Sequence, residues 1–408
     1  MKTLIFMSFL VFSFFLACQQ YPSSPHYNTN PVNPSDPIDE NPVNNPGNTY
    51  NEFFDNSSMT FRRVYSDSGP TNAQSVIKTS DGGYALIGTA GNQFYLIKTD
   101  ACGNARWKKK YGQSGIRHTG MSLRQTPDGG FILIGSEDFD DGLDKVKIVK
   151  TDKNGKLRWQ RSFDDLLVYY ITDIALTHDN GYVGLAYHRS VRGATVFKLN
   201  SGGHLLWVKT YSYGEYPTQG RSIEKCSDNG FIITGWTLLG DENEDIFLLK
   251  IDADGNEQWQ SVWGEKEQDI GNQVIQTSDG GYVVVGKITK EFNYLSYISL
   301  SKTDSQGKLL WTQKHLLRDA IAGYSVQQLS DQSFIVLGYY YNETILLKTG
   351  SDGTYQWHKS YDQSVLKSGF DLVIASDGGY VIAATMNNSS TAFDTRAGLI
   401  KTDASGNF

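Results

Sequence analysis

Short apolar runs alternate with compact polar turns along the chain, from about residue 74 to the C-terminus. Runs such as residues 131–134 and 282–285 are almost continuously apolar, which is typical of strands covered on both faces. Each run follows a turn that reads Asp-Gly-Gly-Tyr or a close variant. The Asp of this turn recurs at Asp81, Asp128, Asp179, Asp228, Asp279, Asp331 and Asp377, at spacings of 46 to 52 residues. A repeat of this length with several short strands per unit predicts a β-propeller.

The first repeat indicates how the strands are arranged within one unit. Residues 74–79 predict an inner strand, and the Asp-Gly-Gly turn leads into a second, apolar strand at 84–89. A third strand is expected at 94–99, and a second Gly-containing turn leads to a fourth strand at 106–111. Each unit is therefore predicted to be a four-stranded blade, and the fold class is all-β.

The fourth strand shows how the ring is expected to close. Six repeats contain this strand, and a tryptophan marks it at Trp107, Trp159, Trp207, Trp259, Trp311 and Trp357. The seventh repeat ends at residues 403–408, where its fourth strand is expected to begin. Residues 60–65 have the missing pattern, with Phe61 in the place of tryptophan. We therefore expect this segment to pair beside Leu399 and Lys401, which predicts seven complete blades without an open sheet edge.

The recurring Asp, Gly and Trp residues are interpreted as parts of the scaffold, because a reaction does not require the same residue in every repeat. The Gly pair supplies the positive φ that a tight turn needs. The Asp is expected to cap its own turn through backbone amides. Each Trp is expected to bury its ring between blades.

The N-terminus predicts export and a lipid anchor. Lys2 precedes an apolar stretch at residues 4–16, which is too short to span a bilayer and predicts a signal peptide over residues 1–17. This stretch ends in Phe-Leu-Ala-Cys, which resembles the lipobox of bacterial lipoproteins and implies lipidation of Cys18. Cleavage by an ordinary signal peptidase, with an incidental Cys, is the alternative.

A segment of different composition separates the anchor from the repeats. Residues 18–58 contain seven of the ten prolines among many Asn, Ser and Asp residues, which predicts a disordered tether. Gln19 follows the Cys, where an Asp would indicate retention in an inner membrane. The expected location is the cell envelope, at the outer membrane. The propeller itself is expected over residues 59–408, with membrane contact through the N-terminal lipid only.

Charge and composition limit the classes of partner. The net charge is −7, and Lys and Arg are scattered along the strands. Because nucleic-acid binding needs a basic stripe, this class of partner is excluded. No metal site or cofactor is predicted. Residues 252–256 resemble the opening of an EF-hand loop, but Trp263 stands where the loop needs a bidentate Glu.

The repeat resembles known propeller families. Residues 150–159 read Lys-Thr-Asp-x-x-Gly-x-x-x-Trp and look like the tryptophan-docking repeat of pyrroloquinoline-quinone-type propellers. Together with the Asp-Gly-Gly-Tyr turn, the unit is similar to uncharacterised propeller lipoproteins of Gram-negative bacteria, over roughly residues 60–408. The resemblance implies the fold but no single activity, because propellers include enzymes, lectins and assembly scaffolds. The calcium site and acidic base of the quinone enzymes do not map onto matching positions here.

Function is expected on one face of the ring, which we name the loop-rich face. Because strands alternate in direction, the loops between second and third strands share this face with the connections between blades, and variation is concentrated there. Its distinctive acidic or aromatic loops are residues 137–141, 241–245, 290–294, 339–341 and 386–396.

Two variable positions recur near this face. One follows the Gly of the second strand, and the other lies at the entry of the inner strand. From these positions we select five candidate ligand contacts: Trp236, Tyr187, Tyr339, Arg221 and Tyr324.

The leading hypothesis is a non-enzymatic, lipid-anchored module that binds a protein or glycan on its loop-rich face. The alternative is a glycan-active or quinone-dependent enzyme, which would need several carboxylates or arginines converging in the central channel. A third hypothesis is a spacer, which would have no concave pocket. The sequence assigns no catalytic residue.

Overall fold

The structure is a computed structural model of the 408-residue chain. It describes residues 60–67, 69–113, 115–138, 145–163, 168–188, 192–240, 243–290, 295–317, 322–340, 343–361, 368–387 and 395–408. The predicted signal peptide, the lipidation site at Cys18 and the whole of the predicted tether lie outside these residues. Within them, no helix is long and apolar enough to cross a membrane.

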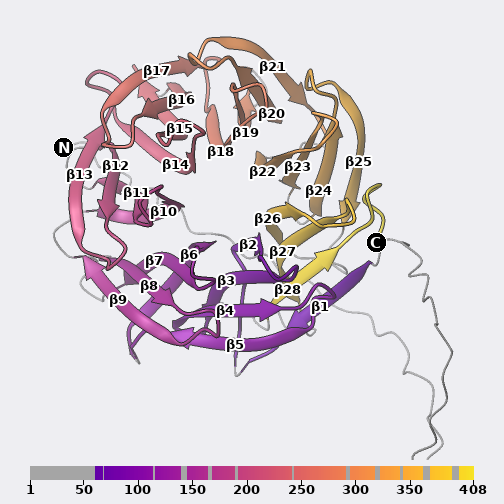
Figure 1. The fold of residues 1–408 in the computed structure, drawn as a ribbon. Coiled ribbons are helices and arrows are strands. Elements are labelled where there is room, and N and C mark those ends of the chain that lie inside the picture. The colour runs from indigo at the N-terminus through magenta and orange to yellow at the C-terminus, as the bar shows by residue number, and fades with distance from the viewer. Residues whose placement is uncertain are drawn as a thin grey trace, which may run out of the picture. The chain divides into compact units, whose positions relative to one another are not determined.

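The described strands form seven antiparallel sheets of four strands, arranged as blades around a ring (Figure 1). Blade 1 comprises β2 (Ser75–Lys78), β3 (Tyr84–Ala90), β4 (Gln93–Thr99) and β5 (Ala105–Tyr111). Blade 2 comprises β6 (Arg117–Gln125), β7 (Phe131–Asp138), β8 (Lys145–Thr151) and β9 (Leu157–Phe163). Blade 3 comprises β10 (Val168–Leu176), β11 (Tyr182–His188), β12 (Ala194–Leu199) and β13 (Leu205–Tyr211).

The second half of the ring repeats this order. Blade 4 comprises β14 (Thr218–Lys225), β15 (Phe231–Leu239), β16 (Asn243–Ile251) and β17 (Glu257–Trp263). Blade 5 comprises β18 (Ile270–Gln276), β19 (Tyr282–Thr289), β20 (Ser296–Thr303) and β21 (Leu309–His315). Blade 6 comprises β22 (Ala322–Gln328), β23 (Phe334–Tyr340), β24 (Glu343–Thr349) and β25 (Tyr355–Tyr361). Blade 7 comprises β26 (Ser368–Ile374), β27 (Tyr380–Asn387), β28 (Thr395–Lys401) and, as its fourth strand, β1 (Phe61–Tyr65).

The last blade combines the two ends of the described chain. Strand β1 pairs antiparallel with β28, with Phe61 opposite Lys401 and Arg63 opposite Leu399. Figure 1 shows the indigo β1 beside the yellow β28. This is the register expected from the sequence, and it gives the outer edge of blade 7 the same fourth strand as the other blades.

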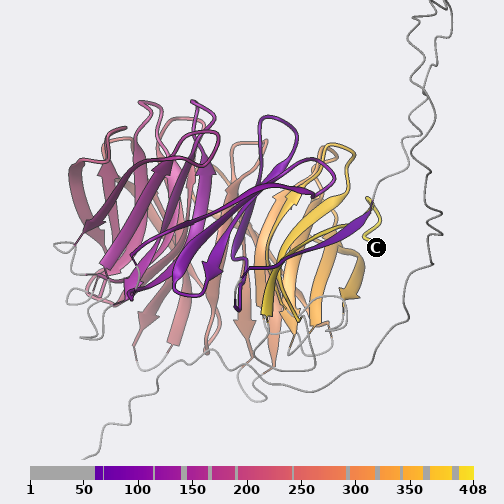
Figure 2. The ribbon, with the colours of Figure 1, turned by 90° about the horizontal axis from the view of Figure 1, so that it is seen from below.

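The hydrophobic core lies between blades. Ile87 and Phe94 of blade 1, for example, pack in one cluster with Leu123, Phe131 and Leu133 of blade 2, and all five side chains are fully buried. Figure 2 shows the blades from the side, packed face to face. Both faces of each middle strand are therefore covered, which explains the continuous apolar runs in the sequence.

A repeated contact joins the outer strand of each blade to the next blade. The ring of Trp107 in β5 packs against Gly155, where an added Cβ would lie 2.8 Å from Cζ3 of the tryptophan. Gly155 has a φ of +74°, so a side chain there would be strained as well as obstructed. The hydroxyl of Tyr111, on the same strand, donates to the carbonyl oxygen of Gly155 at 2.6 Å. Phe61 and Tyr65 make the same two contacts with Gly103.

A second repeated feature stabilises the Asp-Gly-Gly turns. In all seven blades, the Lys of the third strand forms an ion pair with the Asp of this turn, at N–O distances of 2.5 to 3.5 Å. The pairs are Lys98–Asp81, Lys150–Asp128, Lys198–Asp179, Lys250–Asp228, Lys302–Asp279, Lys348–Asp331 and Lys401–Asp377. The Asp also accepts from its own turn, as Asp128 does from the amide of Gly130 at 2.9 Å. The turn cap was expected from the sequence, whereas the ion pair was not.

These bonds shift the acidity of the turn aspartates. For Asp128, burial favours the neutral acid, but hydrogen bonds from Lys150, Thr126 and Gly130 outweigh it and lower the pKa to about 2. Asp81 and Asp179 also have their pKa lowered to about 2. The folded state therefore binds these protons more weakly than the unfolded chain does.

We predict that the β1 seam is required for stability. Phe61→Ala should lower the free energy of unfolding by about 3–5 kcal/mol, because the 5% exposed ring would leave a cavity against Gly103. The control is Val64→Ala on the same strand, where the side chain is 40% exposed and the expected change is within about 0.5 kcal/mol. Equal denaturation midpoints for the two variants would contradict the role of this seam.

We also predict acid sensitivity from the turn ion pairs. Because the pKa is lowered on folding, their contribution is complete above about pH 4 and is lost as the pH falls through about 2. Lys150→Met should lower the denaturation midpoint at neutral pH and weaken the decline between pH 4 and pH 2. Lys153→Met, which alters an exposed side chain in the neighbouring turn, is the matched control. A Lys150→Met profile parallel to that of the unmodified protein would refute the prediction.

Candidate functional site

Most inner strands contain a β-bulge near the loop-rich face. The register of β14 against β15 shifts between Gly220 and Ser222, which makes Arg221 the extra residue. The same shift occurs around Asn272 in β18 and Tyr324 in β22. Because a bulge re-aims a side chain, the variable position at the inner-strand entry is the place where each blade can present a different group.

Three of the five predicted contacts lie together at this end of the ring. Nη1 of Arg221 donates to Oδ1 of Asn272 at 3.0 Å, and Nδ2 of Asn272 donates to the carbonyl oxygen of Gly323 at 2.8 Å. Burial raises the pKa of Tyr324, the positive charge of Arg221 opposes this rise, and the phenol of Tyr339 adds to it. We name Arg221, Asn272, Tyr324 and Tyr339, from blades 4 to 6, the rim cluster.

Two charged groups that were not among the five predicted contacts interact with the rim cluster. Burial raises the pKa of Glu244 on β16, and the positive charges of Lys287 and Arg221 oppose this effect. Burial lowers the pKa of Lys287 on β19, and the carboxylates of Glu244 and Asp269 counteract it. Nζ of Lys287 also donates to Oε1 of Gln268 at 3.2 Å. Lys287 occupies the variable position after the second-strand Gly, so the sequence did contain a signal for it.

The other two predicted contacts lie near the cluster or one blade away. Trp236 is half-buried on β15 and pairs with Gln219 of β14, the strand that carries Arg221. Tyr187 is half-buried on β11 of blade 3. Within the described part of the chain, Nε of Arg221 is buried and has no hydrogen-bond partner. Leaving a buried donor unpaired costs free energy.

Two acids expected on the loop-rich face are buried inside blades. Glu137, 3% exposed, lies with Oε1 at 3.0 Å from Nε2 of His118 and accepts from Nζ of Lys147 at 3.4 Å. Asp245, 8% exposed, accepts from Nδ2 of Asn243 at 3.0 Å. Buried carboxylates need such partners, so these two acids act in the scaffold. Residues 139–144, 241–242, 291–294, 341–342 and 388–394 of the loops on this face lie outside the described residues.

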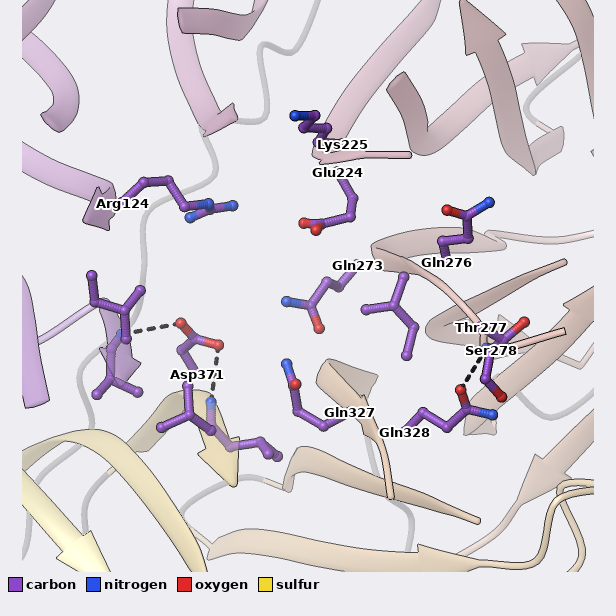
Figure 3. Close-up of a pocket in the computed structure, with 15 residues that line it drawn as sticks. Arg124, Glu224, Lys225, Gln273, Gln276, Thr277, Ser278, Gln327, Gln328 and Asp371 are labelled. Atoms are coloured by element: carbon purple, nitrogen blue, oxygen red, sulfur yellow. Dashed lines mark hydrogen bonds between the residues drawn. The ribbon is translucent and has the colours of Figure 1, made fainter. Parts of the chain in front are cut away.

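A cavity of about 610 Å³ lies at the other end of the ring axis, near the Asp-Gly-Gly turns (Figure 3). Inner strands of six blades line it, together with turn residues of blade 5. We name it the axial pocket; its polar lining consists of Arg124, Glu224, Lys225, Gln273, Gln276, Thr277, Ser278, Gln327, Gln328 and Asp371. None of the five predicted contacts lines it, so sequence reasoning missed this site.

A signal for the axial pocket was present in the inner strands. The position three residues after the variable inner-strand entry reads Ile77, Arg124, Ala175, Glu224, Ile275, Gln327 and Val373. Four blades have an apolar residue there, and three have a charge or an amide. A charged or amide side chain at an inner-strand position that is apolar in the other blades indicates a solvated or ligand-binding cavity at the axis.

Two acids near the axis are committed to joining blades. Asp371 accepts from the hydroxyl of Ser75 at 2.8 Å, the amide of Val76 at 3.1 Å and the hydroxyl of Ser325 at 2.9 Å, which connects blades 6, 7 and 1. Asp173 similarly accepts from blade 2 and from the amide of blade 4 that follows Ser222. Since their oxygens already hold several donors, these acids are structural.

Glu224 and Arg124 are the principal charged groups that face each other across the pocket. Burial raises the pKa of Glu224, and the guanidinium of Arg124 opposes this rise. Burial disfavours the charge of Arg124, but the carboxylates of Asp173, Glu224 and Asp371 outweigh it and raise the pKa. Arg124 also pairs with Asp173, with Nη2 at 3.1 Å from Oδ1. Arg124 therefore remains charged between several acids.

Across the described ranges, no group of three His, Cys, Asp or Glu side chains is placed to hold a metal ion. The two described cysteines, Cys102 and Cys226, are free thiols.

No protein-family model matches the chain, and no curated protein matches it. Among solved structures, the chain is similar to the β-propeller domain of Cps50 (Swd1) from Myceliophteria thermophila, with a TM-score of 0.53 and 10% identity over 84% of this chain and 100% of that one. It is also similar to the BP39L lectin from Burkholderia pseudomallei, with a TM-score of 0.55 and 9% identity over 77% and 96% of the two chains. At such low identity the shared property is the fold, and the chain is a seven-bladed β-propeller.

Proposed function

We propose that this protein is a lipid-anchored binding module of the cell envelope, which holds a protein or glycan on its loop-rich face without catalysing a reaction. The rim cluster carries the proposal. Arg and Tyr are residue types that dominate binding energy at interfaces, and here they converge from separate blades with a donor of Arg221 unpaired. Half-buried aromatic rings on a rigid scaffold can stack on a sugar or anchor a protein side chain.

The proposed anchor places this face in the envelope. A lipid on Cys18 would hold the ring at the outer membrane through the segment that precedes Phe61. Similar folds occur in the propeller domain of Cps50 (Swd1) and in the BP39L lectin, which belongs to a carbohydrate-binding class of protein. A binding role agrees with the lectin example without selecting a ligand.

A second candidate function is an enzyme that acts on a glycan or uses a quinone. One observation favours it: Arg221, Glu244 and Lys287 interact at one end of the ring, and groups with shifted pKa values are common at catalytic sites. The two candidates differ in what Lys287→Met does. An enzyme that uses this amine would keep its ligand and lose turnover, whereas a binding module would change only in affinity.

We predict that Cys18 determines membrane attachment. In a Gram-negative host, Cys18→Ser should transfer most of the protein from the outer-membrane fraction to the soluble fraction, because the lipid acceptor is lost. Fractionation with immunodetection, and mass measurement of the N-terminal peptide, would test this. Gln19→Ser is the neighbouring control and should stay at the membrane. Membrane attachment of Cys18→Ser equal to that of the unmodified protein would exclude the lipid anchor.

We predict that binding on the loop-rich face depends on the aromatic and Arg side chains. The full chain would be applied to a glycan array and cross-linked to solubilised outer-membrane proteins. Arg221→Ala, Trp236→Ala and Tyr339→Ala should each weaken the detected interaction by about tenfold or more, as truncation of a central contact does.

Tyr355→Ala is the matched control for this experiment, because Tyr355 is an aromatic residue that is 51% exposed on the outer strand β25. Its binding should equal that of the unmodified protein. If Arg221→Ala and Tyr339→Ala also bind equally well, the rim cluster is not the binding site.

A further inference from the structure

We propose that the axial pocket binds a neutral mono- or disaccharide, with Gln327, Gln273 and Glu224 as its hydrogen-bonding contacts. This site lies at the opposite end of the inner strands from the rim cluster and is separate from the proposed function. Its volume of about 610 Å³ falls within the usual range of small-molecule sites. The argument depends on which polar groups of the pocket are already occupied.

Several polar atoms of the pocket make no hydrogen bond within the described residues. Neither the carboxylate of Glu224 nor the amide of Gln327 forms a side-chain hydrogen bond there, and both line the cavity. Oε1 of Gln273 accepts from the amide of Val326 at 2.6 Å, which leaves its Nε2 as a donor. Figure 3 shows these side chains on neighbouring inner strands around one space. The site thus offers both donors and acceptors, as hydroxyl groups require.

The charges of the pocket select against a charged ligand. An anion would meet the carboxylates of Glu224 and Asp371, and a cation would meet Arg124 and Lys225. The carboxylates around Arg124 balance its positive charge. The cavity therefore has no strong excess of positive or negative charge. A neutral molecule with many hydroxyl groups can use the unpaired amides and carboxylate without this repulsion.

The apolar part of the lining also suits a sugar. Ile77, Ile275 and Val373 are half-buried at the axis, between the polar residues. A pyranose has C–H groups on one face and hydroxyls around its edge, so apolar and hydrogen-bonding surfaces are needed together.

The pocket is also rigid, which favours binding of a small ligand. Oε1 of Gln328 accepts from the amide of Ser278 at 2.8 Å, which fixes blade 6 to the turn of blade 5. Oε1 of Gln276 accepts from the amide of Ser227 at 2.8 Å and fixes blade 5 to the turn of blade 4. These cross-blade bonds hold the lining in place before a ligand arrives, which lowers the entropic cost of binding.

Saturation-transfer NMR and calorimetry on the full chain would test the proposal, with glucose, galactose, N-acetylglucosamine and maltose as probes at millimolar concentration. At least one probe should bind. Gln327→Leu should weaken its affinity by about tenfold, the effect of losing one or two hydrogen bonds. Glu224→Gln, which keeps the shape but replaces a charged acceptor with a neutral amide, should also weaken the affinity by about tenfold, because a sugar hydroxyl donates more strongly to a carboxylate.

Controls separate this site from the loop-rich face and from loss of folding. Trp236→Ala, on the loop-rich side, should bind the same probe as well as the unmodified protein. Gln327→Leu should keep the denaturation midpoint, since it leaves no buried donor unpaired. Failure of all four sugars to bind would overturn the proposal. So would a folded Gln327→Leu with unchanged affinity, or a preference for glucuronate or for a polyamine over the neutral sugars.

Discussion

One directional contact holds the ring together. An aromatic side chain from the outer strand of one blade packs on a glycine of the next blade, as Trp107 does on Gly155. At four of the seven described seams, a tyrosine from the same strand also donates to the carbonyl oxygen of that glycine, as Tyr111 does to Gly155. Each blade offers the aromatic residues on one side and the glycine on the other, so an open array would leave one of each unused. Closing the ring pairs these last two groups, as head-to-tail interfaces do when the subunits form a closed ring. Phe61 and Gly103 complete it at the point where the two ends of the described chain meet.

This contact and the buried middle strands leave few positions free for function. The outer strand is committed to the next blade, and the second and third strands form the core between blades. The turn aspartates are committed to lysines of the third strand. What remains is the inner strand, where Arg221 sits at a bulge and Glu224 lies three residues further along. Both candidate sites use this strand, because its positions at the bulge and three residues beyond it carry different side chains in different blades.

The sequence predicted the features that depend on local pattern. The strands of blade 1, the seven repeats and the pairing of Phe61 with Lys401 follow from periodicity and from one missing strand. The ion pair of Lys150 with Asp128 was not predicted, because its partners are 22 residues apart and meet only through strand register. The loop position of Glu137 suggested exposure, but β7 continues through it and buries it. The axial pocket was missed for a related reason, since single polar residues from several inner strands become one site only after the ring has closed.

The two ends of the inner strands differ in how they can recognise a ligand. Near the Asp-Gly-Gly turns, the lining consists of strand residues fixed by cross-blade bonds such as that of Gln328 with Ser278. A cavity built in this way has a fixed shape and suits a small molecule. The rim cluster instead lies at β-bulges, where each blade can present a different side chain. Coupling between two sites needs an element with two discrete arrangements, so the packed strand that joins the two ends is not by itself expected to let binding at one end alter the other.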